Sequence, residues 1–542
     1  MNSGRQRMRP FILHGTAVAG LALTAWGCGR QPAATPAPPG GSTVARSPAS
    51  RAAGDKLIAG AITAVSRLDD FDEQRAYEQA FDRLTQWSHL SPADAVAWRL
   101  DPLVATLRED LRAGGRTTLD QPSFDATGDV ALLRDTRWLA DIADAVRGDA
   151  VDDLEVALKL FEWTVRSLAI VGDPPMVPTA ATPGTRWFLP GEVLLSGRAS
   201  GPQRSWIFIE LLRQSGIDAV MLATGDAATG TLRPWVPAAI IGGEAHLFEP
   251  TYGMPIPGRD GRGVATVRDA ADDASVLEGL SLPDRPYPVK AADAATLSVL
   301  VAADPRSLSK RMAVLDRDCR TRHGMRLAVD ADAVGRRAIA ALPNADARVE
   351  LWEFPWETAL RRRSDAAVEA TVRRELAPLS VTFTETGRGD RDTARLVRPL
   401  FRARVREFRG DLDGPEGAKA AYLAARPSKA VIQDAIRNVP PEQSDLVERL
   451  YRQMKEDATY WLGVVTLEEG EYQAAVDYLG RMTLEAAPDS RWTDAARANL
   501  GRALAALGKT DEAIAVLRED GSPQRFGSRI LADRLEKTAA HK

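Results

Sequence analysis

The chain has 542 residues and a formal net charge of −4, with 44% apolar and 27% charged residues. This composition is typical of globular domains and excludes a collagen, a wholly disordered chain and a multi-spanning membrane protein. The small negative charge argues against a nucleic-acid-binding protein. Two cysteines and five histidines are too few for a disulfide framework or a structural zinc site, so we expect no metal and no cofactor. The length predicts three or four domains.

The first 28 residues have the pattern of an export signal. A basic stretch precedes an apolar run at residues 11–26, and Gly27 stands directly before Cys28. The run is shorter than the roughly 20 residues that a membrane-spanning helix needs, so we predict a signal peptide. A cysteine at the cleavage point resembles the signal of bacterial lipoproteins, which implies a lipidated Cys28 at the mature N-terminus. Ala25 and Gly27 also suit an ordinary signal peptidase that leaves Cys28 unmodified, and a retained signal anchor is a third interpretation.

Residues 29–54 predict a disordered tether. Five prolines lie among alanine, glycine and serine, and few apolar groups are present to offset the entropy of ordering. Such a spacer lets a folded body stand away from a membrane surface. We therefore expect an exported protein of the cell envelope, membrane-anchored through Cys28 or periplasmic if Cys28 is unlipidated.

Residues 55–172 predict a helical region, because apolar residues recur there at helical spacing. A helix start is expected at Ser91, since serine caps a helix and Pro92 suits its first position. A further helix is expected at 152–171.

Residues 173–290 predict an α+β domain. After a passage rich in proline and glycine, a helix is expected at 203–214, with Gly216 as its C-terminal cap. Strand patterns follow at 217–223, 235–241 and 245–248. Gly242 and Gly243 join the last two strands as a hairpin turn.

Residues 291–391 mix the two kinds of pattern, and we describe them as an α/β connector. Strands are expected at 325–329 and 348–354. Helices are expected at 306–315 and 332–342. These patterns do not identify a known fold.

Residues 392–542 predict an all-α region that contains a repeat. The segment 461–463 (Trp-Leu-Gly) with Gly470 and Ala475 is echoed by 499–501 (Asn-Leu-Gly) with Gly508 and Ala513, 38 residues later. This echo resembles the tetratricopeptide repeat, whose period is 34, with four extra residues expected in the connection at 491–494. The resemblance implies stacked helical hairpins, capped by helices before residue 454, with a groove for a protein or peptide partner. A helical bundle with chance similarity is the alternative.

Between residues 194 and 258 the sequence resembles the transglutaminase-like superfamily of papain-like enzymes. Segments of 207–217 (Ile-Phe, Leu-Leu-Arg and Gly-Ile) match the second half of the family's catalytic helix. Residues 235–236 match the end of its His-x-Trp-Val motif, and 248–251 match its Phe-Asp-Pro-Thr motif. The resemblance implies a papain-like α+β core. It assigns the triad positions of cysteine, histidine and aspartate to Gly201, Arg233 and Glu249.

Two of these three positions cannot perform the family's chemistry. Acyl transfer needs a thiolate activated by an imidazole, with a carboxylate that orients the ring. Gly201 has no nucleophile, and Arg233 stays protonated and cannot act as a base. Only Glu249 keeps its carboxylate. The departure from the family pattern implies a pseudoenzyme with no catalytic residues.

A relocated nucleophile is the competing hypothesis. Ser200 and Ser205 flank the start of the helix, but the nearest imidazole in sequence, His246, lies an odd number of strand positions from the retained carboxylate and is expected to face away. Cys319 and His323 are four residues apart and form the other thiol–imidazole pair. A semi-buried cysteine near a helix end is the simpler explanation for that pair.

These patterns together predict a multidomain α+β protein that binds partners and does not catalyse. Our main hypothesis is a non-catalytic envelope lipoprotein that scaffolds protein partners through its repeats. In the altered cleft we expect an ion pair between Arg233 and Glu249, or a site where Arg233 binds an acidic peptide or sugar group. The alternative function is an active acyl hydrolase or transferase with a relocated serine or cysteine. A cell-wall glycan or peptide binder is the third hypothesis.

Overall fold

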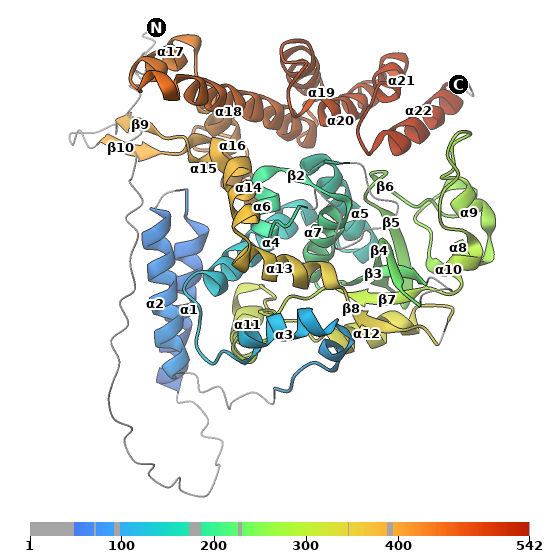
Figure 1. Ribbon diagram of the computed structural model, residues 1–542. Helices are drawn as coiled ribbons and strands as arrows, with labels where there is room; N and C mark the ends of the chain where they lie inside the picture. The colour runs from blue at the N-terminus through green and yellow to red at the C-terminus, as the bar shows by residue number, and fades with distance from the viewer. Residues whose placement is uncertain are drawn as a thin grey trace, which may run out of the picture.

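The computed structural model describes residues 48–69, 72–90, 98–172, 186–225, 230–344, 346–386 and 394–540. Cys28, most of the predicted tether, the expected helix start at Ser91 and the passage 173–185 lie outside these residues. A central sheet is surrounded by helices, and the C-terminal helices lie across the top of the molecule (Figure 1). Within the described ranges, no helix combines the length and apolarity needed to cross a membrane.

The N-terminal region is helical, as predicted for 55–172. Its elements are α1 (Pro48–Ser66), α2 (Glu73–Leu90), the short 3₁₀ helix η2 (Pro102–Thr106), α3 (Glu109–Asp120), α4 (Gly128–Arg147) and α5 (Asp153–Ser167). The predicted end of the disordered tether at residue 54 is wrong, because residues 48–54 already belong to α1. Alanines in this stretch favour a helix, and Gly54 lies against the ring of Trp87 on α2.

The sheet has six strands in the order β6-β5-β4-β3-β7-β8. These are β6 (Met254–Pro255), β5 (Glu244–Glu249), β4 (Leu232–Ile241), β3 (Asp218–Gly225), β7 (Ser298–Val301) and β8 (Val349–Leu351). Neighbours are antiparallel except β7 and β8, which are parallel. The predicted hairpin joins β4 to β5, and Gly242 and Gly243 have the positive φ angles, 61° and 82°, that its tight turn requires.

The two faces of the sheet are covered by different helices. Alternate residues such as Met221 and Phe248 point to one face, where α7 (Gly201–Gln214) packs on β3 and β4. Residues of the opposite register, such as Leu222 and Leu247, pack under α12 (Ala331–Ala340) and α8 (Val267–Asp272). The start of α7 therefore lies at the edge of the sheet domain, which we define as residues 186–351.

The predicted boundary between residues 290 and 291 runs through this single sheet. β7 and β8 come from the predicted connector, yet β7 pairs with β3 and extends the sheet. The strand expected at 325–329 is not formed, because the amides of Leu327 and Ala328 donate to the carboxylate of Asp316 on α11 (Lys310–His323) at 2.6 and 3.0 Å. The strand expected at 348–354 ends at Leu351, and α13 (Glu353–Ser364) follows.

Short elements complete this part of the chain. They are β1 (Ala169–Ile170), α6 (Pro190–Ser196), β2 (Arg198–Ala199), η3 (Arg259–Gly261), α9 (Ala274–Glu278), α10 (Ala291–Ala294), α14 (Ala366–Leu376), η4 (Ala377–Ser380), β9 (Phe383–Thr386) and β10 (Ala394–Val397). β1 pairs with β2 in parallel, and β9 with β10 as an antiparallel ribbon.

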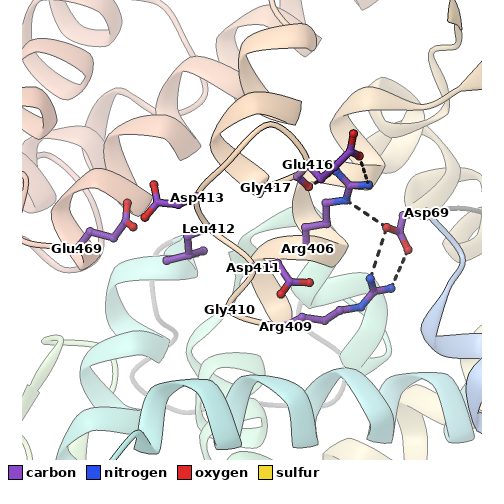
Figure 2. Close-up of a pocket in the computed structure, with 10 residues that line it drawn as sticks. All are labelled: Asp69, Arg406, Arg409, Gly410, Asp411, Leu412, Asp413, Glu416, Gly417 and Glu469. Atoms are coloured by element: carbon purple, nitrogen blue, oxygen red, sulfur yellow. Dashed lines mark hydrogen bonds and ion pairs between the residues drawn. The ribbon is translucent and has the colours of Figure 1, made fainter. Parts of the chain in front are cut away.

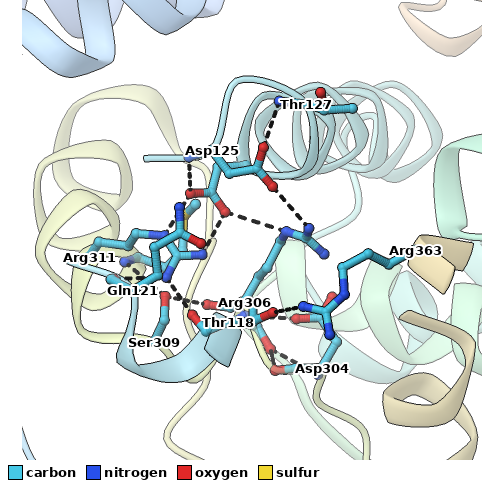
Figure 3. Close-up of polar contacts among 12 residues, drawn as sticks. Thr118, Gln121, Asp125, Thr127, Asp304, Arg306, Ser309, Arg311 and Arg363 are labelled. Atoms are coloured by element: carbon cyan, nitrogen blue, oxygen red, sulfur yellow. Dashed lines mark hydrogen bonds and ion pairs between the residues drawn. The ribbon is translucent and has the colours of Figure 1, made fainter. Parts of the chain in front are cut away.

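A buried ionic network ties the N-terminal helices to the sheet domain (Figure 3). Arg311 donates to both carboxylate oxygens of Asp129 at 2.6 and 2.8 Å and to the carbonyl oxygen of Thr118 at 2.6 Å. Arg306 joins the same cluster through Asp125 at 3.2 Å. The network links α3, α4 and α11, so helices that are distant in sequence are held in one arrangement.

The C-terminal region, predicted to be all-α from residue 392, begins instead with the strand β10, and its described residues are helical from α15 onward. Its helices are α15 (Pro399–Phe408), α16 (Ala418–Ala424), α17 (Lys429–Arg437), α18 (Pro441–Glu468), α19 (Tyr472–Val476), the π-helix η5 (Asp477–Glu485), α20 (Thr493–Ala506), α21 (Thr510–Arg518) and α22 (Arg525–Ala540). α18 with α19–η5 forms the first repeat hairpin, and α20 with α21 forms the second.

Equivalent residues of the two hairpins occupy equivalent places. Gly470 and Gly508 turn the chain with φ angles of 75° and 74°, and Ala475 and Ala513 are fully buried. A Cβ at Gly501 would come within 2.5 Å of Leu517, so only glycine allows this close approach. The second helix of the first repeat runs from 472 to 485 and ends in the π-helix, whereas α21 has nine residues. Part of the extra length therefore precedes the expected connection at 491–494.

Candidate functional site

The three positions that the sequence assigns to a lost triad meet in one pocket. Gly201, Arg233 and Glu249 line a cavity of about 210 Å³ between the start of α7, the strand β4 and the end of β5. These residues come from three elements spread over 49 positions of sequence, and only the folded sheet brings them together. This pocket is the candidate functional site.

Gly201 opens α7 and leaves the floor of the pocket bare. Ser200 caps the helix, since its hydroxyl accepts a hydrogen bond from the amide of Gln203. The φ angle of Gly201 lies outside the left-handed region, so the backbone does not require glycine here. A Cβ at this position would lie 3.2 Å from the hydroxyl oxygen of Thr251. The missing side chain is therefore what keeps this part of the cavity open.

Glu249 is held at the end of β5 by neutral donors. Its side chain is buried, and its two oxygens accept from the hydroxyl of Tyr287 at 2.6 Å and the amide of Thr251 at 2.9 Å. Trp235 donates in turn to the Tyr287 oxygen at 2.9 Å. Burial raises the pKa of Glu249 above its usual value, although these hydrogen bonds oppose the shift.

Arg233 lies exposed at the rim of the pocket, on β4 opposite Thr224. Both oxygens of Glu249 already have donors in Tyr287 and Thr251, so the carboxyl group does not depend on Arg233 for its hydrogen bonds. Sequence reasoning missed Tyr287, because no motif marks it and it is 38 residues from Glu249. The one sequence feature that could have drawn attention to Tyr287 is its position between two prolines.

The serine candidates have no imidazole beside them in the described pocket. Ser205 lines the cavity, but its hydroxyl donates to the carbonyl oxygen of Gly201 at 3.0 Å. No histidine and no cysteine is among the described residues that line this pocket. His246 lies on β5 opposite Ala239 and is not a lining residue. Among these residues, no imidazole is thus available to activate a serine.

The other thiol–imidazole pair lies elsewhere. Cys319 on α11 is fully buried in an apolar cluster with residues of α1, α2 and α4. Burial raises the pKa of its thiol, which makes the reactive thiolate rarer still. His323, in the last turn of α11, is half-buried, and burial lowers its pKa. Cys319 is a core residue of this cluster.

The C-terminal end of the repeats forms part of the wall behind the pocket. The rings of Tyr252 and Phe526 lie 5.8 Å apart, and the guanidinium group of Arg285 lies 3.8 Å from the centre of the Phe526 ring. A Cβ at Gly527 would come within 1.8 Å of the Tyr252 carbonyl oxygen, so α22 and the loop after Glu249 touch at backbone distance. Two pocket residues, Tyr252 and Arg285, are therefore positioned by the repeat region.

A buried arginine joins the same elements. Arg204 on α7 donates to the carbonyl oxygens of Leu168 and Pro250 at 2.9 and 2.7 Å and to the side-chain oxygen of Gln524 at 2.7 Å. Burial lowers its pKa to about 9, so it remains a cation at neutral pH. Its partners come from the end of α5, the pocket loop and the repeat region.

The first helices of the repeats face the protein's own core. Trp461 on α18 and Trp492 before α20 are fully buried, and Asn499 is 2% exposed. Asn499 donates to the carbonyl oxygen of Arg166 on α5 at 3.1 Å. This side of the repeats therefore makes an intramolecular contact, which corrects the expectation of an open groove for a partner there. The second helices α19, η5 and α21 lie on the outer side (Figure 1).

A second hollow, of about 620 Å³, lies between α1, α15 and the loop 410–417 (Figure 2). Asp69 is buried at its edge and pairs with Arg406 and Arg409 at 3.3 and 2.7 Å. Lys419 pairs in turn with Asp413 and Glu469 nearby, at 2.6 and 2.7 Å. These pairs link the N-terminal hairpin to α15 and neutralise charge. No group of ligands suited to a metal ion occurs among the described residues.

We expect the Glu249→Gln substitution to change how stability depends on pH. The folded-state pKa of Glu249 is raised above the ordinary glutamate pKa of 4.5. Protonated Glu249 therefore stabilises the folded protein below pH 4.5, and this stabilisation is lost as pH rises through the folded-state pKa. The variant cannot ionise, so it should gain stability relative to the parent protein between about pH 4.5 and 7.5, by about 1.4 kcal/mol for each tenfold difference in proton affinity. Urea unfolding at pH values of about 4.5 and 7.5 measures the difference in the free energy of unfolding between the variant and the parent protein. Glu512→Gln on α21 is the control variant. A difference that is constant with pH would contradict the prediction.

One comparison with known proteins identifies part of the chain. Residues 466–526 match the family model described as tetratricopeptide repeat. No curated protein and no solved structure matches the chain. The match covers the end of α18, all of α19, η5, α20 and α21, and the start of α22, the region in which the sequence pattern predicted the repeat. The C-terminal region therefore contains tetratricopeptide repeats.

Proposed function

We propose that this protein is a non-catalytic scaffold of the bacterial cell envelope, with a transglutaminase-like pseudoenzyme domain and a repeat region that binds a protein partner. Tetratricopeptide repeats support a protein-interaction role. The pseudoenzyme part is supported by one observation above all: the three positions assigned to the triad line one pocket, and two of them carry no group able to act as nucleophile or base.

The envelope location is supported by the N-terminal sequence. A basic stretch, an apolar run at 11–26 and a cysteine at position 28 together favour export and lipidation. The proline-rich stretch that follows suits a body held at a distance from a membrane. In this proposal, the repeats and the pocket face the compartment outside the inner membrane.

The outer side of the repeats is the surface proposed for the partner. Burial of Trp461, Trp492 and Asn499 makes this face of the first helices unavailable to a partner. The second helices carry exposed charged side chains, among them Arg481 at 65% and Glu512 at 61% exposure. Exposed charge favours a polar, reversible interface over a permanently buried one.

Chemical labelling tests the absence of catalysis. We expect no fluorophosphonate adduct on Ser200 or Ser205 in the native protein, because no imidazole is among the described residues that line the pocket. Iodoacetamide should leave Cys319 unmodified until the protein is unfolded, since this thiol is fully buried. Gly201→Cys is the positive control, because its thiol would lie in the open pocket and should react in the native state. A stoichiometric native-state adduct on Ser200, Ser205 or Cys319 would contradict the proposal.

Site-specific crosslinking tests the partner surface in cells that export the full chain. A photoreactive amino acid at Arg481 or Glu512 should yield a discrete adduct of the same mass at both positions. Val151, which is 84% exposed between α4 and α5, is the control position and should not yield that adduct. The proposal is wrong if the adduct forms equally at Val151, or if neither repeat position yields one.

A further inference from the structure

We propose that the pocket around Gly201 is a binding site for the acidic side chain of a peptide, whose carboxylate is held between Arg233, Arg285 and the start of α7. This inference rests on the non-catalytic function proposed above and adds the chemistry of the ligand. It concerns a site that neither the repeat family nor the lost triad chemistry assigns.

The first step is the available space. The cavity of about 210 Å³ corresponds to roughly seven water volumes of about 30 Å³ each, which is enough for a carboxylate on a short aliphatic stem. Part of this space exists because position 201 has no side chain, although its backbone conformation would accept one. The space at position 201, where the family carries its nucleophile, is therefore open to a ligand.

The second step is the charge of the lining. Two arginines, Arg233 and Arg285, line the pocket, and the single carboxyl group among its described lining residues is Glu249. Both oxygens of Glu249 already accept hydrogen bonds from Tyr287 and Thr251, and its one carboxyl group is outnumbered by the two arginines. The helix α7, of 14 residues, begins at the pocket with Gly201 and adds the partial positive charge of its first turn. All three features favour an anion.

The third step is how the two cations are placed. The guanidinium group of Arg285 stacks on Phe526 of α22, which holds it at the inner side of the pocket. Arg233 is exposed at the rim, on the strand β4. An entering carboxylate would therefore meet an exposed cation first and a stacked one further in. Arginine suits this task because its planar group can bind both carboxylate oxygens.

The fourth step separates a peptide from a sugar acid. Three polar groups of the walls already have partners within the protein, since Tyr287 donates to Glu249, Trp235 donates to Tyr287 and Ser205 donates to the carbonyl oxygen of Gly201. A sugar would bring several hydroxyl groups that need partners of their own. The rest of the described lining is mainly apolar or aromatic, with two threonine hydroxyl groups: Trp352, Tyr252, Met221, Val289, Pro202, Pro234, Pro250, Pro288, Thr224 and Thr251. A ligand with one charged end and an otherwise apolar stem fits this lining best.

Calorimetric titration of the full mature chain tests the inference with defined probes. N-acetyl-glutamate N-methylamide should bind saturably, and the matched glutamine compound should bind at least tenfold more weakly because it lacks the charge. Affinity for the glutamate compound should fall as salt is raised, as expected for an ion pair near the surface. Glucuronate and N-acetyl-alanine, which supply a carboxylate on a sugar and on a peptide C-terminus, should bind more weakly than the glutamate compound.

Two variants and a control assign the binding to this pocket. Arg233→Gln should weaken binding of the glutamate compound at least fivefold without changing the melting temperature, because the residue is exposed. Gly201→Leu should abolish binding by filling the cavity. Arg373→Gln, at an exposed position of α14 outside the pocket, should leave the affinity unchanged. If Gly201→Leu fails to fold, Arg233→Gln alone decides the assignment.

Several results would overturn the inference. These are equal affinity for the glutamine compound, tighter binding of glucuronate or N-acetyl-alanine, an unchanged affinity in Arg233→Gln, or no saturable binding of the glutamate compound at about 10 mM, which detects millimolar affinities. The mass of the probe after incubation separates this inference from the proposed function. Cleavage or transfer of its amide would refute the non-catalytic function, whereas an intact probe that does not bind refutes only the present inference.

Discussion

The rest of the structure depends on one buried cation, Arg204. It lies within α7 and donates to backbone oxygens of Leu168 and Pro250 and to the side chain of Gln524. Each of these partners belongs to a different part of the chain. An unsatisfied buried acceptor costs about 1–3 kcal/mol, so displacing any one of these parts leaves both the cation and its acceptors without partners. The sheet domain, the pocket loop and the repeats are thereby held in one arrangement.

This arrangement changes the role of the repeats. In a free stack, the first helices would be available to a ligand, but here Trp461 and Trp492 complete the apolar core of the sheet domain. The same contact places Phe526 behind Arg285 and the backbone of Gly527 against Tyr252. A partner on the outer helices and a ligand in the pocket would thus act on two sides of one rigid connection. The repeat region thus lies behind the pocket and contacts two of its lining residues, Tyr252 and Arg285.

Local sequence patterns predicted many of the helices and turns of this structure. They did not predict the contacts between segments that are distant in sequence. The helix at 203–214, the hairpin at Gly242 and the paired repeat glycines each depend on neighbours in sequence, and each forms as expected. β7 joins the sheet through β3, 75 residues earlier, and no local pattern records such a pairing. Motif alignment placed Gly201, Arg233 and Glu249 in one pocket, whereas Tyr287 was missed because it belongs to no motif. The buried side of the repeats was missed for a related reason, since helical spacing shows which residues are apolar but not what covers them.

Native-state hydrogen exchange tests most directly the claim that the repeats and the sheet domain share one core. The slowest amides of α7 and α20 should open with the same free energy and the same dependence on denaturant, because both helices unfold only when the shared core does. Arg204→Met should lower both free energies together. A markedly lower opening free energy for α20, with its own smaller dependence on denaturant, would show that the repeats unfold as a separate unit and would contradict this account.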